Sequence, residues 1–170
     1  PASHGWYAVP ARVSQHVSRR RGPVRDMLKN MRVTMLLADH AVVAEGKLYV
    51  NGGGWSIRPA APTPMYLALK FDVPWDLAGH PIELELRLVD EDGRLVAQRT
   101  PNGDQPVLLS ARLEVQRPPE LTPGAPIDAA MAIGVPPFGL PGGRRFSWRL
   151  AVDGHQREDW VIEFATRPEA

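Results

Sequence analysis

Proline and glycine recur along the whole chain, and this feature most limits what the chain can fold into. The 170 residues include 18 prolines and 15 glycines, which is well above ordinary usage. Proline removes a backbone donor and glycine raises the entropy cost of ordering, so a mostly helical fold is excluded. The chain has no cysteine, which excludes disulfides, thiolate metal sites and cysteine nucleophiles. Its length fits one domain with a core.

Between these turn residues, apolar side chains recur with a period of two, which is typical of strands with one buried face. Strands are expected over residues 31–39, 65–73, 82–98 (a hairpin that turns at Asp92–Gly93), 107–116, 127–134, 145–154 and 159–168. The expected inward residues are Leu67, Leu69, Phe71, Val73, Ile82, Leu84, Leu86, Leu88, Leu109, Ala111, Leu113, Val115, Ile127, Ala129, Met131, Ile133, Phe146, Trp148, Leu150, Val152, Trp160, Ile162 and Phe164.

Eight to ten short strands of this kind predict an all-β fold, an antiparallel sandwich in which two sheets pack face to face. The Pro-rich links at residues 59–64 and 117–126 suit crossings between the sheets. A closed β-barrel is the alternative, because closure removes the sheet edges. In an open sandwich, the edge strands are expected near residues 65–73 or 108–115, and their free edges favour self-association.

Three segments lack this alternation. Residues 40–46 are expected to form a short irregular or helical turn, and residues 136–143 a loop. Residues 47–58 are expected to form either a hairpin around Gly52–Gly54 or one strand with a bulge, since glycine inside a strand often marks a bulge.

The first 30 residues differ from the rest in charge. They hold Arg12, Arg19, Arg20, Arg21, Arg25 and Lys29 against the single acid Asp26, whereas the remaining chain is mildly acidic. We interpret residues 1–30 as a basic arm, either flexible or outside the natural domain, and residues 31–168 as the β-sandwich domain. Such an arm would suit contact with an acidic partner, while the body carries no basic stripe for nucleic acid.

Three stretches carry a resemblance to a known group of proteins. They are ADHAVVAEGKLYVNGGGWSI (residues 38–57), LRLVDEDGRLV (86–96) and PPFGLPGGRRFSWRLAVDG (136–154). Together they resemble a family of small uncharacterised bacterial proteins common in high-GC genomes, over about residues 31–168. The resemblance implies an immunoglobulin-like or C2-like sandwich and brings no activity, cofactor or site residue with it.

The residues most often used in catalysis form no recognisable motif. The Gly52–Gly54 loop precedes a strand-like WSIR run, whereas a phosphate loop precedes a helix, so a turn or bulge is favoured. The body's histidines are His40, His80 and His155, and none of its serines Ser56, Ser110 and Ser147 lies in a nucleophile elbow. The chain is therefore expected not to be an enzyme, and a hydrolase with an unrecognised site is the remote alternative.

Acidic residues at strand ends give one weak candidate for a metal site. Asp90, Asp92 and Asp153 lie at expected turns, and C2-type domains collect calcium with such loop carboxylates. The calcium-loop spacing D-x-D-x-D is absent, and aspartate followed by glycine is ordinary turn chemistry without a metal. No cofactor is expected.

Four tryptophans could build an aromatic platform for a ligand. Trp148 and Trp160 fall on inward faces and are expected in the core, Trp75 is expected to cap it, and Trp55 follows the glycine loop. Together these observations predict a cytoplasmic, non-enzymatic sandwich module that is structural or protein-binding, including possible self-association, with no membrane contact. The alternative is a ligand- or calcium-binding domain that uses loop carboxylates.

Overall fold

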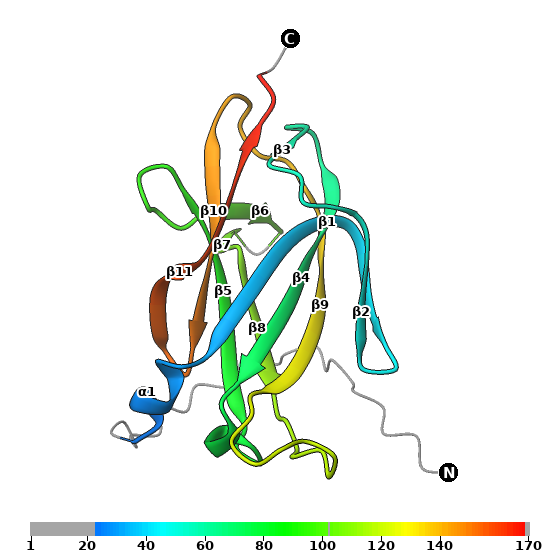
Figure 1. The fold of residues 1–170 in the computed structure, drawn as a ribbon. Helices are drawn as coiled ribbons and strands as arrows, with labels where there is room; N and C mark the ends of the chain where they lie inside the picture. Colours follow the sequence, from blue (N-terminus) through cyan, green and yellow to red (C-terminus); the bar gives the residue numbers. More distant parts are fainter. Residues whose placement is uncertain (1–22, 102, 169–170) are drawn as a thin grey trace.

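The computed structural model describes residues 23–101 and 103–168, and their regular secondary structure is almost wholly β-strand (Figure 1). Their helical elements are α1 (Pro23–Leu28) and the 3-10 turn η1 (Trp75–Leu77). The strands, eleven where eight to ten were expected, are β1 (Arg32–Ala44), β2 (Lys47–Gly53), β3 (Ile57–Arg58), β4 (Thr63–Val73), β5 (Ile82–Asp90), β6 (Ala97–Thr100), β7 (Gly103–Pro106), β8 (Leu108–Leu113), β9 (Ile127–Phe138), β10 (Arg145–Val152) and β11 (His155–Thr166).

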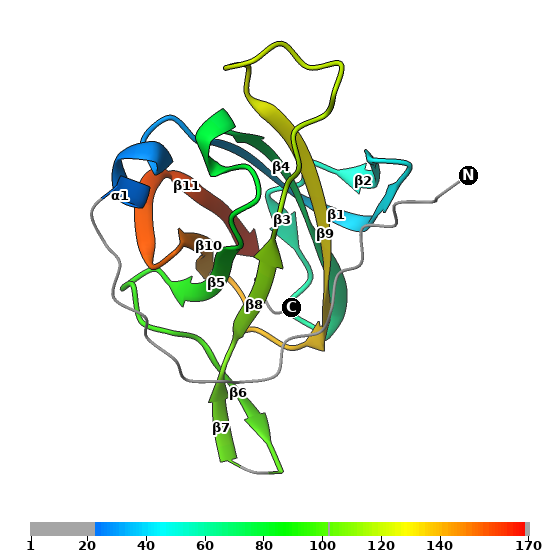
Figure 2. The same cartoon turned by 90° about the horizontal axis from the view of Figure 1, so that it is seen from below.

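Two sheets pack face to face. Sheet A has four strands in the order β2-β1-β4-β9, and sheet B has five in the order β3-β11-β10-β5-β8. Seen from below in Figure 2, β1, β4 and β9 lie in one layer, while β11, β10 and β5 lie in the other. The expected all-β sandwich is confirmed. Both sheets remain open with separate edges, so the alternative of a closed barrel is wrong.

The core lies between the two sheets and follows the alternation of the sequence. Leu67, Leu69, Phe71 and Val73 of β4 are fully buried. Ile82, Leu84, Leu86 and Leu88 of β5 meet them from sheet B, together with Phe146, Trp148, Leu150, Val152, Trp160 and Phe164. Ala129, Ile133 and Ile162 are partly buried against this core, as are Leu109 and Ala111. The expected inward faces are therefore confirmed.

The Pro-rich links carry the chain from one sheet to the other, as expected. Residues 59–62 connect β3 of sheet B to β4 of sheet A, and residues 114–126 connect β8 of sheet B to β9 of sheet A. Between β4 and β5, Trp75 packs partly buried against the core, and the guanidinium of Arg117 lies 5.0 Å from its ring centroid. Trp75 thus caps the core, as its loop position predicts.

The first hairpin turns earlier than expected. Glu45 and Gly46 have φ values of 50° and 71°, and two consecutive positive φ values are what a two-residue hairpin turn requires. β1 therefore continues through residue 44 and pairs with β2, so the irregular or helical turn expected over residues 40–46 is wrong. Gly52–Gly54 is neither a hairpin nor a bulge in one continuous strand, because the chain leaves sheet A there and enters sheet B at β3.

Two other segments differ in part from expectation. The chain turns near Asp92–Gly93, as expected for a hairpin over residues 82–98. After the turn, however, it pairs with β5 through a single bridge, between Val89 and Leu95. The chain then forms β6 and β7, which pair only with each other and project from the body (Figure 2). β9 runs on to Phe138 through Pro136 and Pro137, so the loop expected over residues 136–143 begins three residues later, and proline is tolerated because β9 is an edge strand.

The end of the supposed basic arm packs on the body. Leu28 and Met31 are buried in the core, at 2% and 0% exposure. Arg157 of β11 holds this segment, donating to the carbonyls of Lys29 at 2.7 Å and Met31 at 3.2 Å. The expectation that residues 1–30 lie apart from the body is therefore wrong for residues 23–30, and residues 1–22 lie outside the described residues.

The sheet edges are only partly those expected. β4, expected as an edge near residues 65–73, is central in sheet A because β1 and β9 pair with its two sides. β8, expected near residues 108–115, is indeed an edge of sheet B, and the other edges are β2, β9 and β3.

Candidate binding surfaces

The outer face of sheet A is apolar over one half of its length. Alternate residues of β1 face the core, and Leu36 points to the opposite face, where it is 38% exposed. Val42 and Tyr49 are cross-strand partners, 45% and 50% exposed. On this face the rings of Tyr66 and His40 lie with centroids 4.8 Å apart. We call Leu36, Val42, Tyr49 and Tyr66 the outer patch, since contiguous exposed apolar groups often mark an interaction surface.

The other half of this face is charged. Lys70 donates to Asp128 at 2.8 Å and also to Asp72, and Asp72 and Asp128 are cross-strand partners of β4 and β9. The hydrogen bond to Asp128, followed by that to Asp72, raises the pKa of Lys70 above its ordinary value. The outer patch therefore ends at a self-paired cluster that needs no external partner.

The outer patch reaches the edge strand β2. The side of β2 that faces away from β1 has no proline or charged residue in its middle that would hinder pairing with a further strand. β9 contains two prolines, and β3 has two residues and is followed by Pro59, so both edges resist pairing with another strand. β2 has seven residues without proline, and its one charge, Lys47, lies at its start. Tyr49 and Val50 point to opposite faces of β2, and both are exposed, Val50 at 37%.

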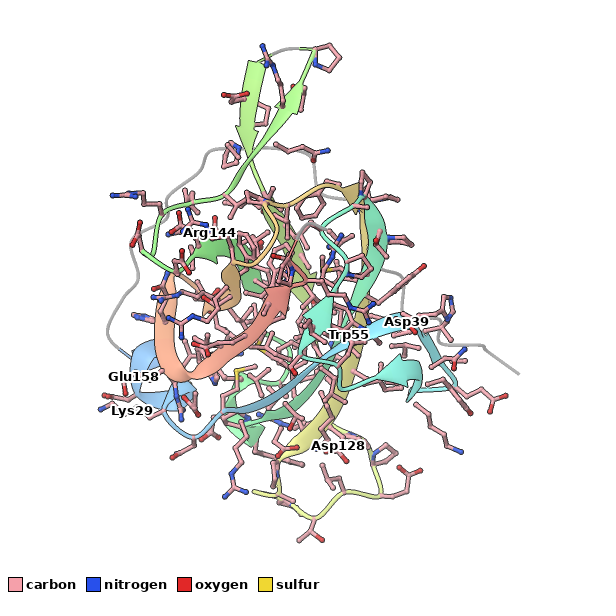
Figure 3. The ribbon with its side chains drawn as sticks, turned by 90° about the horizontal axis from the view of Figure 1, so that it is seen from above. Lys29, Asp39, Trp55, Asp128, Arg144 and Glu158 are labelled. Carbon is pink, nitrogen blue, oxygen red and sulfur yellow. The ribbon has the colours of Figure 1, made fainter. Side chains whose placement is uncertain are left out.

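A pocket of about 220 Å³ lies at the rim of the sandwich, and we call it the rim pocket. Its charged lining residues are Asp39 of β1, Arg58 of β3 and Arg167, which follows β11. Trp55, Ile57, Pro59, Thr63 and Pro64 complete the lining. Figure 3 shows Asp39 and Trp55 beside each other, at the point where the chain passes from sheet A to sheet B.

Arg58 is buried in this rim, with 3% of its surface exposed. Its Nε donates to the carbonyl of Pro59 at 3.1 Å, and its Nη2 donates to the carbonyls of Ala61 and Phe138, both at 3.2 Å. The guanidinium also lies 5.7 Å from the ring centroid of Phe138. Burial lowers the pKa of Arg58 because it disfavours the charged form. Arg58 thus ties the Pro-rich link to the end of β9.

Gly52 and Trp55 pack beside the rim pocket. A side-chain carbon on Gly52 would clash with the carboxylate of Asp39 where it lies in this structure, so the glycine leaves room for that side chain. The ring of Trp55 meets Phe164 edge to face, with centroids 6.0 Å apart. The Gly52–Gly54 loop, which is followed by β3 and not by a helix, therefore shapes the rim pocket and is no phosphate loop.

A wider hollow, of about 550 Å³, lies over the outer face of β10 and β11. Its lining includes Arg157, Glu158 and Glu163. Arg157 already has partners within the chain. Its Nε and Nη2 each donate to one carboxylate oxygen of Asp159, both at 2.7 Å, and its Nη1 holds the segment after α1. We assign no ligand to this hollow.

The candidate metal residues are not brought together. Asp90 accepts bonds from the backbone N–H groups of Asp92 (3.0 Å) and Arg94 (2.8 Å), and Asp92 pairs with Arg94. Asp153 accepts from the N–H of Glu83 at 2.9 Å. Asp90 and Asp153 lie at opposite ends of β5, roughly 20 Å apart at the rise of a strand. Among residues 23–101 and 103–168, no three acidic or histidine side chains form a group that could hold a metal ion.

The histidines and serines considered for hydrolysis are equally dispersed. The ring of His40 packs at a tilt of 57° against that of Tyr66 on the outer face of sheet A, His80 contacts the carbonyl of Ala78 at 3.2 Å, and His155 begins β11. Ser56 precedes β3, Ser110 lies on β8 and Ser147 on β10. Trp148 and Trp160 are in the core, as expected, and therefore build no platform.

Sequence reasoning missed Arg58 and Arg167 as site residues. The only local signal for Arg58 was its position between an apolar residue and a Pro-rich link. That signal does not predict burial, because the carbonyl of Phe138 that Arg58 contacts lies 80 residues away in the sequence.

No helix in the described part of the chain has the length and apolar character needed to cross a membrane.

Comparison with known proteins adds a family but no activity. Residues 33–165 match the family model of DUF6941, which is described as a family of unknown function. No curated protein and no solved structure matches the chain.

Proposed function

The chain belongs to DUF6941, a family of unknown function, and we propose that it is a non-enzymatic protein-binding module that associates through the β1–β2 hairpin. The observation that carries this proposal is the exposure of Val42, Tyr49 and Val50, at 45%, 50% and 37%, on an unprotected edge strand and its neighbour. A free edge offers backbone donors and acceptors, and adjacent exposed apolar side chains add area to bury.

The partner that fits this surface is a second copy of the chain. A two-fold dimer uses the same surface from both copies, so β2 would pair antiparallel with β2 of the second copy. This pairing doubles the four-stranded sheet A and brings the two outer patches side by side. The formal net charge of the chain is only +1, so electrostatic repulsion opposes this contact little.

We propose that the module is bacterial and cytoplasmic, and that its sandwich is of the immunoglobulin-like or C2-like kind. Calcium plays no part in the proposed binding role. What supports this is that Asp90, Asp92 and Asp153 already accept hydrogen bonds from neighbouring groups of the chain.

Light scattering over a tenfold concentration range tests the association. We expect the mass to rise above 18.8 kDa with concentration. Tyr49→Lys should weaken association about tenfold or more, because it removes buried apolar area and places two like charges at the seam. Leu108→Lys is the matched control, since Leu108 is 37% exposed on another edge, β8. A constant mass near 18.8 kDa, or equal effects of the two variants, would contradict the proposal.

A further inference from the structure

The turn between β1 and β2 determines which backbone groups of β2 point away from the fold. Ala44 and Lys47 flank a two-residue turn and therefore form a hydrogen-bonded pair, and such pairs alternate along an antiparallel ladder with pairs that exchange no hydrogen bonds. Tyr49, two residues after Lys47, is thus turned toward β1. Leu48 and Val50 direct their N–H and C=O groups to the other side, where β2 has no neighbour among the described residues.

Two glycines limit the length of β2 that a further strand could follow. Gly46 in the turn and Gly52 near the end of β2 have φ values of 71° and 61°, which lie outside the range of an extended strand. The extended run between them is residues 47–51, and Tyr49 is its midpoint. Every residue of this run is exposed except Leu48, which is half-buried, so its free edge is open to a partner (Figure 1).

This run is complementary to itself about its midpoint. A two-fold axis perpendicular to the sheet pairs residues that lie equally far on either side of it. With the axis at Tyr49, Leu48 lies opposite Val50 of the second copy, and Val50 lies opposite its Leu48. Both pairs are hydrogen-bonded, because these residues direct their backbone groups across the seam. The two Tyr49 residues then form a non-hydrogen-bonded pair, with Cα atoms about 4.5 Å apart.

Other positions of the axis fit less well. An axis at Val50 would pair Leu48 with Gly52, and an axis at Leu48 would pair Val50 with Gly46. In both cases a residue with positive φ would have to form hydrogen bonds across the seam. An axis between two residues would place side chains of opposite faces against each other, because side chains alternate along a strand. Only the axis at Tyr49 uses extended backbone throughout.

Such a dimer leaves sheet A without a further open edge of this kind. The doubled sheet runs from β9 of one copy to β9 of the other, so β9 forms both outer edges. β9 contains Pro136 and Pro137, which lack the N–H group that a further strand would need. Growth of the sheet therefore stops at two copies.

We propose that two copies of the chain form a closed dimer in which the β2 strands pair antiparallel with the two-fold axis at Tyr49. This inference rests on the association proposed above, and it adds the register and the number of copies. On the outer face the two Tyr49 rings lie side by side, and on the opposite face Leu48 of each copy contacts Val50 of the other. The pairing thereby buries Tyr49, which is 50% exposed in the single chain.

Disulfide mapping of the full chain tests this register, because the chain contains no cysteine of its own. In the variant Tyr49→Cys the two introduced thiols face each other at a Cα distance that a disulfide spans. We expect oxidation with diamide to convert this variant largely to a dimer that dithiothreitol separates. Val50→Cys is the matched control. Its two copies of residue 50 would be roughly 8 Å apart, beyond the reach of a disulfide, and should cross-link at least tenfold more slowly.

A second pair of variants keeps Tyr49 in place. Residues 47 and 51 lie opposite each other across the seam, so a mixture of Lys47→Cys and Asn51→Cys should form a mixed disulfide dimer. Each of these variants alone should remain free of cross-links, because its two substituted residues are roughly 14 Å apart. Light scattering of the unsubstituted chain should level off at twice 18.8 kDa.

The outcomes separate this inference from the proposed function. A mass that stays at 18.8 kDa at every concentration would overturn both. A rising mass without cross-linking of Tyr49→Cys and of the mixed pair, or faster cross-linking of Val50→Cys, would overturn the register and leave association through β2 standing. A mass above that of the dimer would show that another edge adds further copies, and would overturn the closed assembly.

Discussion

Two hairpins extend from this sandwich, and they differ in what they expose. The β6–β7 hairpin pairs with no other strand, and its residues AQRT and GDQP are mostly polar and exposed. The β1–β2 hairpin is part of sheet A, yet it exposes Val42, Tyr49 and Val50. Exposed polar side chains are well hydrated, whereas exposed apolar side chains gain from burial, and for this reason we propose a partner for the β1–β2 hairpin and none for the β6–β7 hairpin.

The body of the sandwich is held by its core, and neither hairpin surface is needed for it to fold. Leu86 of β5 is 1% exposed, so Leu86→Asp should unfold the domain by burying an unpaired charge. Glu85→Ala, one residue away on the opposite face, should change the free energy of unfolding by less than about 0.5 kcal/mol. Circular dichroism with urea measures both. Equal tolerance of the two variants would show that Leu86 does not lie in a packed core.

The two turns provide a matched test of how firmly each hairpin is attached. Gly46 of the β1–β2 turn and Gly103 of β7 have φ values of 71° and 97°, and nothing lies within 4 Å of a side-chain carbon added at either. Gly46→Ala should lower the free energy of unfolding by about 1 kcal/mol or more, because β1 is central to sheet A. Gly103→Ala should leave global unfolding nearly unchanged, since β6 and β7 can open locally. Chemical denaturation measures both, and a larger loss for Gly103→Ala than for Gly46→Ala would show that the β6–β7 hairpin is the more firmly attached of the two.

The charged half of the outer face should contribute least. Lys70 and Asp128 are substantially exposed, so Lys70→Gln should lower the free energy of unfolding by less than about 0.5 kcal/mol. Pairing raises the pKa of Lys70 in the folded chain. The small contribution is therefore complete below the pKa of lysine in the unfolded chain and is lost as the pH rises through the higher folded value. A wild-type advantage that grew with rising alkaline pH would contradict this sign.

The body of the fold could be predicted from the sequence because burial there follows a strict period of two. Leu84, Leu86 and Leu88 alternate with charged residues, and no other fold class uses that pattern so consistently. The position of the first hairpin could not be predicted, because Gly52–Gly54 offers more glycine than Glu45–Gly46, although the latter pair makes the turn.

The candidate sites were out of reach for a related reason. The rim pocket depends on Arg58, whose burial requires carbonyls from the Pro-rich link and from the end of β9. Neither pairing leaves a local pattern. The outer patch was hidden because Val42 falls in a segment that shows no alternation, and only the register of β1 with β2 places it beside Tyr49.

Concentration-dependent hydrogen exchange of the β2 backbone reports directly on association through this edge strand. If β2 pairs with β2 of a second copy, the amides of Lys47–Gly53 that point away from β1 should exchange slowly at high protein concentration and rapidly on dilution. The amides of β6 and β7 should exchange rapidly at every concentration. Exchange in β2 that is rapid and independent of concentration would contradict association through this edge.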